Sequence, residues 1–134
     1  MNKEIILDAK ECVLGRVAAH AAKQALLGKT VTIVNCNQAI ITGSKPVILK
    51  KYKSLRAKGG SSLKGPAILK APERIMKRTI RGMLSHRQGR GAQAFARIMC
   101  YNKVPIEFES VEKISLKRQI KTRFTTLTEL SREL

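Results

Sequence analysis

The chain has 134 residues, 43% of them hydrophobic, which is enough for one domain with a substantial core. Its 27 Lys and Arg residues against 9 Asp and Glu give a net charge of +18, and self-repulsion of this size destabilises a compact state unless a polyanion relieves it. No apolar run is long enough to span a membrane, and the N-terminal residues lack the pattern of a signal peptide.

The positive charge is concentrated in the middle of the chain. Residues 40–103 carry sixteen basic side chains and one acidic side chain, whereas the segments before and after them have net charges of +2 and +1. We therefore expect a single domain over residues 1–134, with a nearly neutral frame and a basic binding region at about residues 40–103. Nucleic acid is the first candidate partner, and an anionic membrane surface is the second.

The first third of the chain predicts a strand, a helix and a second strand. Glu4–Asp8 is a short apolar run that we interpret as a buried strand, and Thr30–Asn35 is a β-rich one. Between them, apolar residues recur at helical spacing: Leu14, Val17, Ala18, Ala21, Ala22 and Ala25. Gly28 follows where a left-handed cap is usual. This βαβ pattern predicts parallel strands, a right-handed crossover and helices on both faces of the sheet.

A basic helix is predicted next, after a short connector or strand at Gln38–Thr42. Ser44 is the expected N-cap and Pro46 lies in the first turn. The apolar stripe consists of Ile48, Tyr52 and Leu55, and cations occupy most of the remaining surface: Lys50, Lys51, Lys53, Arg56 and Lys58. Gly59–Pro66, which contains Lys64, predicts a mobile loop that becomes ordered against a partner.

The most informative stretch is Ala71–Tyr101, which predicts two helices joined by a Gly-rich basic loop. The first helix begins at Pro72 and has an apolar face made of Ile75, Met76, Thr79, Ile80, Met83 and Leu84. Another face carries Arg74, Arg78 and Arg81 at positions i, i+4 and i+7, with Lys77 close by. The loop at 85–91 allows the backbone to approach a sugar–phosphate chain closely. The second helix is predicted at 92–99.

The last thirty-five residues give weaker signals. Cys100 and Tyr101 predict the start of an edge strand, and Ile114–Leu116 predicts another strand. We expect Glu107, Glu109 and Glu112 to pair with Lys113, Lys117 or Arg118. Thr126 and Glu129 have capping-box spacing, which predicts a short C-terminal helix.

No set of residues combines a nucleophile, a base and an orienting partner, so we expect no catalytic site. The three cysteines lack zinc-site spacing and are expected to be small buried residues of a cytosolic protein. We predict neither a metal nor a cofactor. Gly28-Lys29-Thr30 resembles the end of a phosphate-binding loop, but it closes a helix instead of opening one. This position argues against nucleotide binding, but a βαβ unit is also found in enzymes. A nucleotide-binding α/β enzyme therefore remains the alternative function.

The basic region favours recognition of phosphate groups over the reading of bases. Its cations release counterions when they neutralise phosphates, and arginine adds planar, bidentate contacts. The chain has only five aromatic residues, and none is interleaved with basic residues as a stacking platform requires. Mobile loops suit an irregular RNA better than DNA.

Several motifs resemble the L-thirteen family of large-subunit ribosomal proteins. The resemblance is carried by the segments Leu14–Lys29, Val31–Lys45, Arg78–Pro105 and Thr125–Leu134. The Arg-Gly-Met-Leu block at 81–84 is its most specific part, although Ser85 stands where members usually have proline. The C-terminal segment resembles the archaeal and eukaryotic branch, and the short length resembles archaeal members.

The resemblance implies a three-layer α/β/α domain with a four-stranded, mostly parallel sheet. It also implies a cytoplasmic, non-enzymatic constituent of the large ribosomal subunit that contacts ribosomal RNA and neighbouring ribosomal proteins, acts early in assembly, and has neither a membrane partner nor a small-molecule substrate. A free RNA-binding regulator remains an alternative. The implied RNA contacts are Lys45, Lys50, Lys51, Lys53, Arg74, Lys77, Arg78, Arg81, Arg87, Arg90 and Arg97, to which we add Arg56, Lys58 and Lys64 from the basic region.

Overall fold

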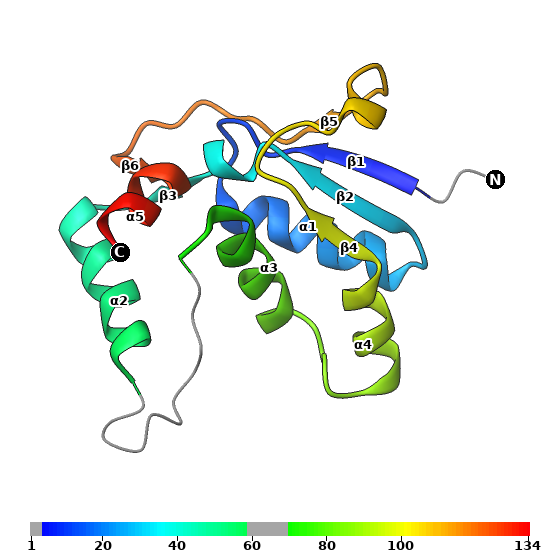
Figure 1. Cartoon of the computed structure of the whole chain (residues 1–134), viewed down its shortest axis with the longest axis horizontal. Coiled ribbons are helices and arrows are strands. Elements are labelled where there is room, and N and C mark those ends of the chain that lie inside the picture. Colours follow the sequence, from blue (N-terminus) through cyan, green and yellow to red (C-terminus); the bar gives the residue numbers. More distant parts are fainter. Residues whose placement is uncertain (1–3, 59–69) are drawn as a thin grey trace.

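The core of the protein is a four-stranded parallel sheet, seen in a computed structural model that describes residues 4–58 and 70–134 (Figure 1). The strands lie in the order β4-β2-β1-β5, and each neighbouring pair is parallel. Their bounds are Glu4–Asp8 for β1, Thr30–Val34 for β2, Ile98–Cys100 for β4 and Ile114–Ser115 for β5. The predicted α/β class and the four-stranded sheet are therefore confirmed.

Helix α1, Leu14–Leu26, connects β1 to β2 as predicted. The two strands pair in register from Glu4 opposite Thr30 to Asp8 opposite Val34. All six apolar positions predicted for this helix are buried. Gly28 has φ +95°, the left-handed conformation that lets the chain leave the helix and enter β2. The interpretation of Gly28-Lys29-Thr30 as a helix end followed by a strand is confirmed.

The helices α1, α3 (Pro72–Gly82) and α4 (Gly89–Ala96) lie on one side of the sheet (Figure 1). Leu7, Val31 and Ile33 face these helices in the buried core, and the intervening Ile6 and Thr32 are buried on the opposite face because side chains alternate along a strand. The chain between β4 and β5 passes on that opposite side, where its helical content among the described residues is the 3₁₀ turn Ile106–Phe108. The second helical layer that the resemblance implied is thus reduced to this turn.

A second, two-stranded sheet was not predicted as such. The short strand anticipated around Gln38–Thr42 exists as β3, Ile40–Thr42, and it pairs antiparallel with β6, Phe124–Thr126. Strand β6 could not be predicted because its three residues are too few to show an alternation of apolar and polar side chains. β6 leads directly into α5, Leu127–Glu133, whose Leu127 and Leu130 are fully buried.

The second helix of the basic stretch lies three residues earlier than predicted. We predicted it at 92–99, but α4 spans Gly89–Ala96. Ile98 and Met99 belong instead to β4, where they pair with Val31 and Thr32 of β2. The edge strand predicted at Cys100 therefore begins at Ile98. Long-range strand pairing overrode a local helical pattern.

The hydroxyl of Thr126 caps α5, as the capping-box spacing predicted, and accepts a hydrogen bond from the Glu129 amide at 3.2 Å. Thr126→Ala leaves this amide without its partner. We expect the free energy of unfolding to fall by about 1 kcal/mol, which is typical of a lost N-cap. Urea denaturation measures the loss. Thr126→Ser should restore most of the stability, and equal losses in the two variants would contradict a capping role.

Candidate nucleic-acid interface

Helix α3 separates a buried apolar face from an exposed face of arginines. Ile75, Met76 and Ile80 are buried, and Leu84 is buried just beyond the helix. Thr79 is half-buried, and its hydroxyl donates to the Ile75 carbonyl at 2.9 Å. The predicted core position at Met83 is wrong, because this side chain is 46% exposed. The helix ends at Gly82, so Met83 no longer follows the helical periodicity.

The arginines of the exposed face have no acidic partner in the described part of the chain. Arg74 and Arg78 are exposed and Arg81 is half-buried. No carboxylate among residues 4–58 and 70–134 forms an ion pair with any of the three. Glu73, the single acid of the region, instead accepts a hydrogen bond from the Asn102 side chain at 2.5 Å. The row of guanidinium groups therefore retains its positive charge.

The turn between α3 and α4 depends on a close approach at Gly91. Gly91 is buried, and a Cβ atom on it would lie 2.1 Å from the carbonyl oxygen of Ser85. That same carbonyl accepts a hydrogen bond from the Gln88 amide at 3.0 Å. The glycine is thus needed to pack α4 against the turn. Arg87 is exposed on this turn.

Lys77 is turned into the fold. Its ammonium group donates to the carbonyl of Phe95 at 3.1 Å and to that of Ile98, and it lies 4.3 Å from the centre of the Phe95 ring. Burial lowers the pKa of Lys77 below its usual value. The direction of the Lys77 side chain could not be predicted from the sequence. Lys77 lies three residues before the buried Ile80, and it is also next to the exposed Arg78.

Two further residues that were predicted to contact RNA donate hydrogen bonds to the C-terminal end of α1. Arg97 donates to the Ala25 carbonyl at 2.9 Å, and the exposed Arg90 donates to the Leu26 carbonyl at 3.5 Å. Cations at this position satisfy unpaired carbonyl groups and interact favourably with the negative end of the helix dipole. No sequence signal reveals this role, because α1 and α4 are more than sixty residues apart.

Helix α2, Lys45–Ala57, carries the other predicted contacts. It extends from the sheet on the same side as α3 and lies beside α5 (Figure 1). Ser44 is its N-cap residue but makes no side-chain capping hydrogen bond. Ile48 is buried, Tyr52 and Leu55 are half-buried, and four predicted contacts are exposed: Lys50, Lys51, Lys53 and Lys58.

Two cations of α2 attach the helix to α5. Lys45 forms an ion pair with Glu133 at 2.5 Å, and Arg56 donates to the main-chain oxygen of Leu134 at 3.1 Å. The pairing with Glu133 raises the pKa of Lys45. These links orient α2 beside the fold. Lys64 and the predicted loop at Gly59–Pro66 lie outside the described residues.

The neighbours Lys77 and Arg78 should respond differently to replacement by alanine. Lys77→Ala leaves two carbonyl groups without their donor, so we expect a loss of about 2 kcal/mol in the free energy of unfolding. Arg78→Ala removes an exposed side chain and should change stability by less than about 0.5 kcal/mol. Urea denaturation of both variants tests this contrast. A stable Lys77→Ala variant would show that the ammonium group has no structural role.

The described residues contain no group of three metal-ligating side chains, and none of their helices combines the length and the apolar character that a membrane span requires. Cys12 and Cys36 are buried, as expected, and Cys100 is half-buried. The adjacent Cys100 thiol and burial raise the pKa of Cys36, which disfavours its reactive thiolate.

Comparison with known proteins identifies the family. The family model described as Ribosomal protein L13 matches residues 2–107. The chain belongs to the ribosomal protein L13 family. It is 41% identical to large ribosomal subunit protein uL13 of Natronomonas pharaonis over 134 residues, covering 99% of this chain and 92% of that protein. The uL13 of Haloarcula marismortui is also 41% identical, over 135 residues, with the same coverage. That of Thermoplasma acidophilum is 40% identical over 132 residues, covering 96% of each chain.

Family membership decides between two of the predicted functions. The L13 family is a structural, non-enzymatic one, so the nucleotide-binding enzyme is excluded in favour of a structural role in the ribosome. The similarity to archaeal uL13 proteins confirms the resemblance inferred from the Arg-Gly-Met-Leu block and its neighbouring segments.

Proposed function

We propose that the protein is a constituent of the large ribosomal subunit in the cytoplasm, where it binds ribosomal RNA and contacts neighbouring ribosomal proteins. The α3 surface carries the RNA contacts. It comprises the cations of α3, of its following turn and of α2 with the adjoining Lys58 whose side chains form no hydrogen bond or ion pair with the described residues: Arg74, Arg78, Arg81, Arg87, Lys50, Lys51, Lys53 and Lys58. The names of the uL13 relatives support the ribosomal role.

The observation that carries the RNA proposal is the uncompensated arginine row of α3. Folding has placed its single acid, Glu73, against Asn102 and has left Arg74, Arg78 and Arg81 without a carboxylate among the described residues. Such a row costs free energy in the isolated protein and becomes favourable when phosphates neutralise it. Apart from Lys64, which lies outside the described residues, the remaining predicted contacts have partners within the fold: Lys45, Arg56, Lys77, Arg90 and Arg97. We therefore assign them to positioning the surface.

The test is a titration of large-subunit ribosomal RNA with the full chain at several salt concentrations. Because each phosphate contact releases counterions, the logarithm of the affinity should fall linearly with the logarithm of salt concentration, by roughly 0.7 to 0.9 per contact. An affinity that does not change with salt would overturn the proposal.

We also propose a role early in subunit assembly. A folded protein that neutralises phosphates at several points lowers the cost of bringing RNA segments together. In reconstitution from purified components, omission of this chain should stop assembly at an early particle. Normal maturation without it would refute the assembly role while leaving RNA binding intact.

A further inference from the structure

A second group of cations lies on the exposed side of α1. Arg16 and Lys23 lie seven residues apart on this helix, and together with Lys117 and Arg118 they line a hollow of about 630 Å³. A smaller hollow of about 280 Å³ adjoins it and is lined by Arg16, Arg118 and Lys121, among others. The two hollows share Arg16 and Arg118. The chain segment 115–123 thus brings its cations to those of α1, from which it is separated by almost a hundred residues in the sequence.

Most of these cations are uncompensated. Lys117 forms an ion pair with Glu11 at 2.5 Å, and this contact lowers the pKa of Glu11, so the pair is ionised and neutral overall at pH 7. Arg16, Lys23, Arg118 and Lys121 form no ion pair with a carboxylate of the described residues. The net charges of residues 1–39 and 104–134 do not reveal this group, because acidic residues elsewhere in these two segments cancel its positive charge.

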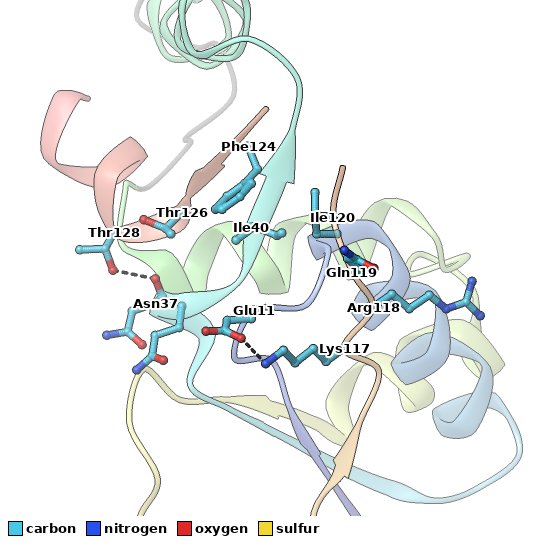
Figure 2. Close-up of a pocket in the computed structure, with 11 residues that line it drawn as sticks. Glu11, Asn37, Ile40, Lys117, Arg118, Gln119, Ile120, Phe124, Thr126 and Thr128 are labelled. Carbon is cyan, nitrogen blue, oxygen red and sulfur yellow. Dashed lines mark hydrogen bonds and ion pairs between the residues drawn. The ribbon is translucent and has the colours of Figure 1, made fainter. Parts of the chain in front are cut away.

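A third hollow, of about 470 Å³, adjoins the same segment and has an apolar wall (Figure 2). The Phe124 ring, 51% exposed, lies over Ile40, and Ile120 stands on the other side of the opening. The Arg118 side chain extends away from this hollow (Figure 2). Phe124 directly follows Arg123, which is also exposed.

A buried side-chain atom beside the same hollow has no hydrogen-bond partner among the described residues. Asn37 lines this hollow, and its Oδ1 atom is buried and accepts no hydrogen bond from the described residues. The main-chain oxygen of Asn37 accepts from the Thr128 hydroxyl at 2.6 Å, which fixes the backbone at this point. An apolar wall with an exposed aromatic ring matches a planar, unpaired base that stacks on the ring.

We propose that the α1 surface, defined as Arg16, Lys23, Arg118 and Lys121, binds a second and unpaired segment of RNA whose phosphates lie on these cations and one of whose bases enters the hollow beside Phe124. This surface shares no residue with the α3 surface. The proposal rests on the proposed RNA-binding function and deepens it, since a protein with two such surfaces joins two separate parts of the RNA. Unpaired RNA fits better than a duplex, because only an unpaired base can enter the hollow.

Footprinting of large-subunit ribosomal RNA with hydroxyl radicals, at saturating full-length protein, tests the α1 surface. The unmodified protein should protect two separate stretches. Arg16→Glu combined with Arg118→Glu should remove one of them and lower the affinity at least about tenfold, whereas Arg78→Glu combined with Arg81→Glu should remove the other. Lys3→Glu combined with Lys10→Glu, which changes the net charge equally, should leave both protected.

The outcomes separate this inference from the proposed function. Unchanged protection in the Arg16/Arg118 variant would overturn the inference, as would loss of the same stretch in both arginine variants. An unmodified protein that protects no RNA would instead refute RNA binding itself. Arg16 and Arg118 are exposed, and neither they nor Arg78 and Arg81 form an ion pair with a described carboxylate. Circular dichroism should therefore show that both double variants, Arg16/Arg118 and Arg78/Arg81, are folded.

The base-binding part is tested with a reagent that modifies unpaired bases, such as dimethyl sulfate. In the stretch protected by the α1 surface, one base should be shielded by the unmodified protein and by Phe124→Tyr, but exposed in Phe124→Leu, because leucine fills the space without stacking. Equal shielding by the leucine variant would show that stacking on the Phe124 ring does not hold the base, and the base assignment would be wrong.

Discussion

Arg78→Glu combined with Arg81→Glu should weaken binding to large-subunit ribosomal RNA about a hundredfold. Each arginine is expected to form a charge-assisted contact with a phosphate worth about 1.5 kcal/mol, so the loss of two corresponds to about 3 kcal/mol. Neither side chain has an acidic partner in the described residues, and the fold should survive the change. Filter binding at fixed salt measures the affinity, and the salt dependence should become shallower by about two contacts.

The matched control replaces two cations from the nearly neutral first 39 residues, as Lys3→Glu with Lys10→Glu. It alters the net charge by the same amount and replaces no residue that defines either proposed surface. We expect its affinity to fall by less than about tenfold, through the long-range field alone. Equal losses in the two double variants would mean that total charge, and not the α3 surface, determines binding.

Gly91→Ala should cost about 3 kcal/mol of folding stability, at the upper end of the range for overpacked sites. The new methyl group would lie 2.1 Å from the Ser85 carbonyl oxygen and 2.5 Å from its carbon, so the turn between α3 and α4 must move. This turn carries Arg87, and RNA affinity should fall together with stability. Urea denaturation and RNA binding of the same preparation measure both effects.

Gly89→Ala provides the control for the glycine prediction, since a Cβ at Gly89 meets no atom within 4 Å. Both glycines lie in the first turn of α4, where alanine is the better helix former by up to about 1 kcal/mol. The Gly89 variant should therefore be as stable as the unmodified protein or slightly more stable. If both variants unfolded at the same urea concentration, the contact between Gly91 and Ser85 would not limit the packing of this turn.

Local patterns in the sequence were sufficient where burial follows a regular period. The βαβ unit and helix α3 were predicted because their apolar residues recur at helical or strand spacing over many residues. The capping of α5 was predicted because the motif that specifies it, Thr126 and Glu129, lies within four residues. Strand β6 and the early start of α4 were missed because partners distant in the sequence determine them, as the pairing of Ile98 with Val31 shows.

The sequence was sufficient to predict which residues supply the positive charge of the candidate site, but only partly which of their side chains face solvent. A cation has the same letter in the sequence whether it faces solvent, as Arg78 does, or donates to a buried carbonyl, as Lys77 does. Expected partners also changed: Lys117 pairs with Glu11, and Lys113 donates to main-chain oxygens of Glu109 and Val111, so neither pairs with the acids at 107–112. Such choices depend on tertiary distances that no spacing in the sequence encodes.

We propose that α3 and its neighbours hold positive charge that ribosomal RNA neutralises in the large subunit. Sedimentation of a native cell lysate tests it most directly. We predict that the protein migrates with the large subunit at low salt and is released only at high salt. The Arg78/Arg81 charge-reversal variant should remain near the top of the gradient. A protein that sediments apart from the large subunit at low salt, or a charge-reversal variant that is incorporated normally, would contradict the claim.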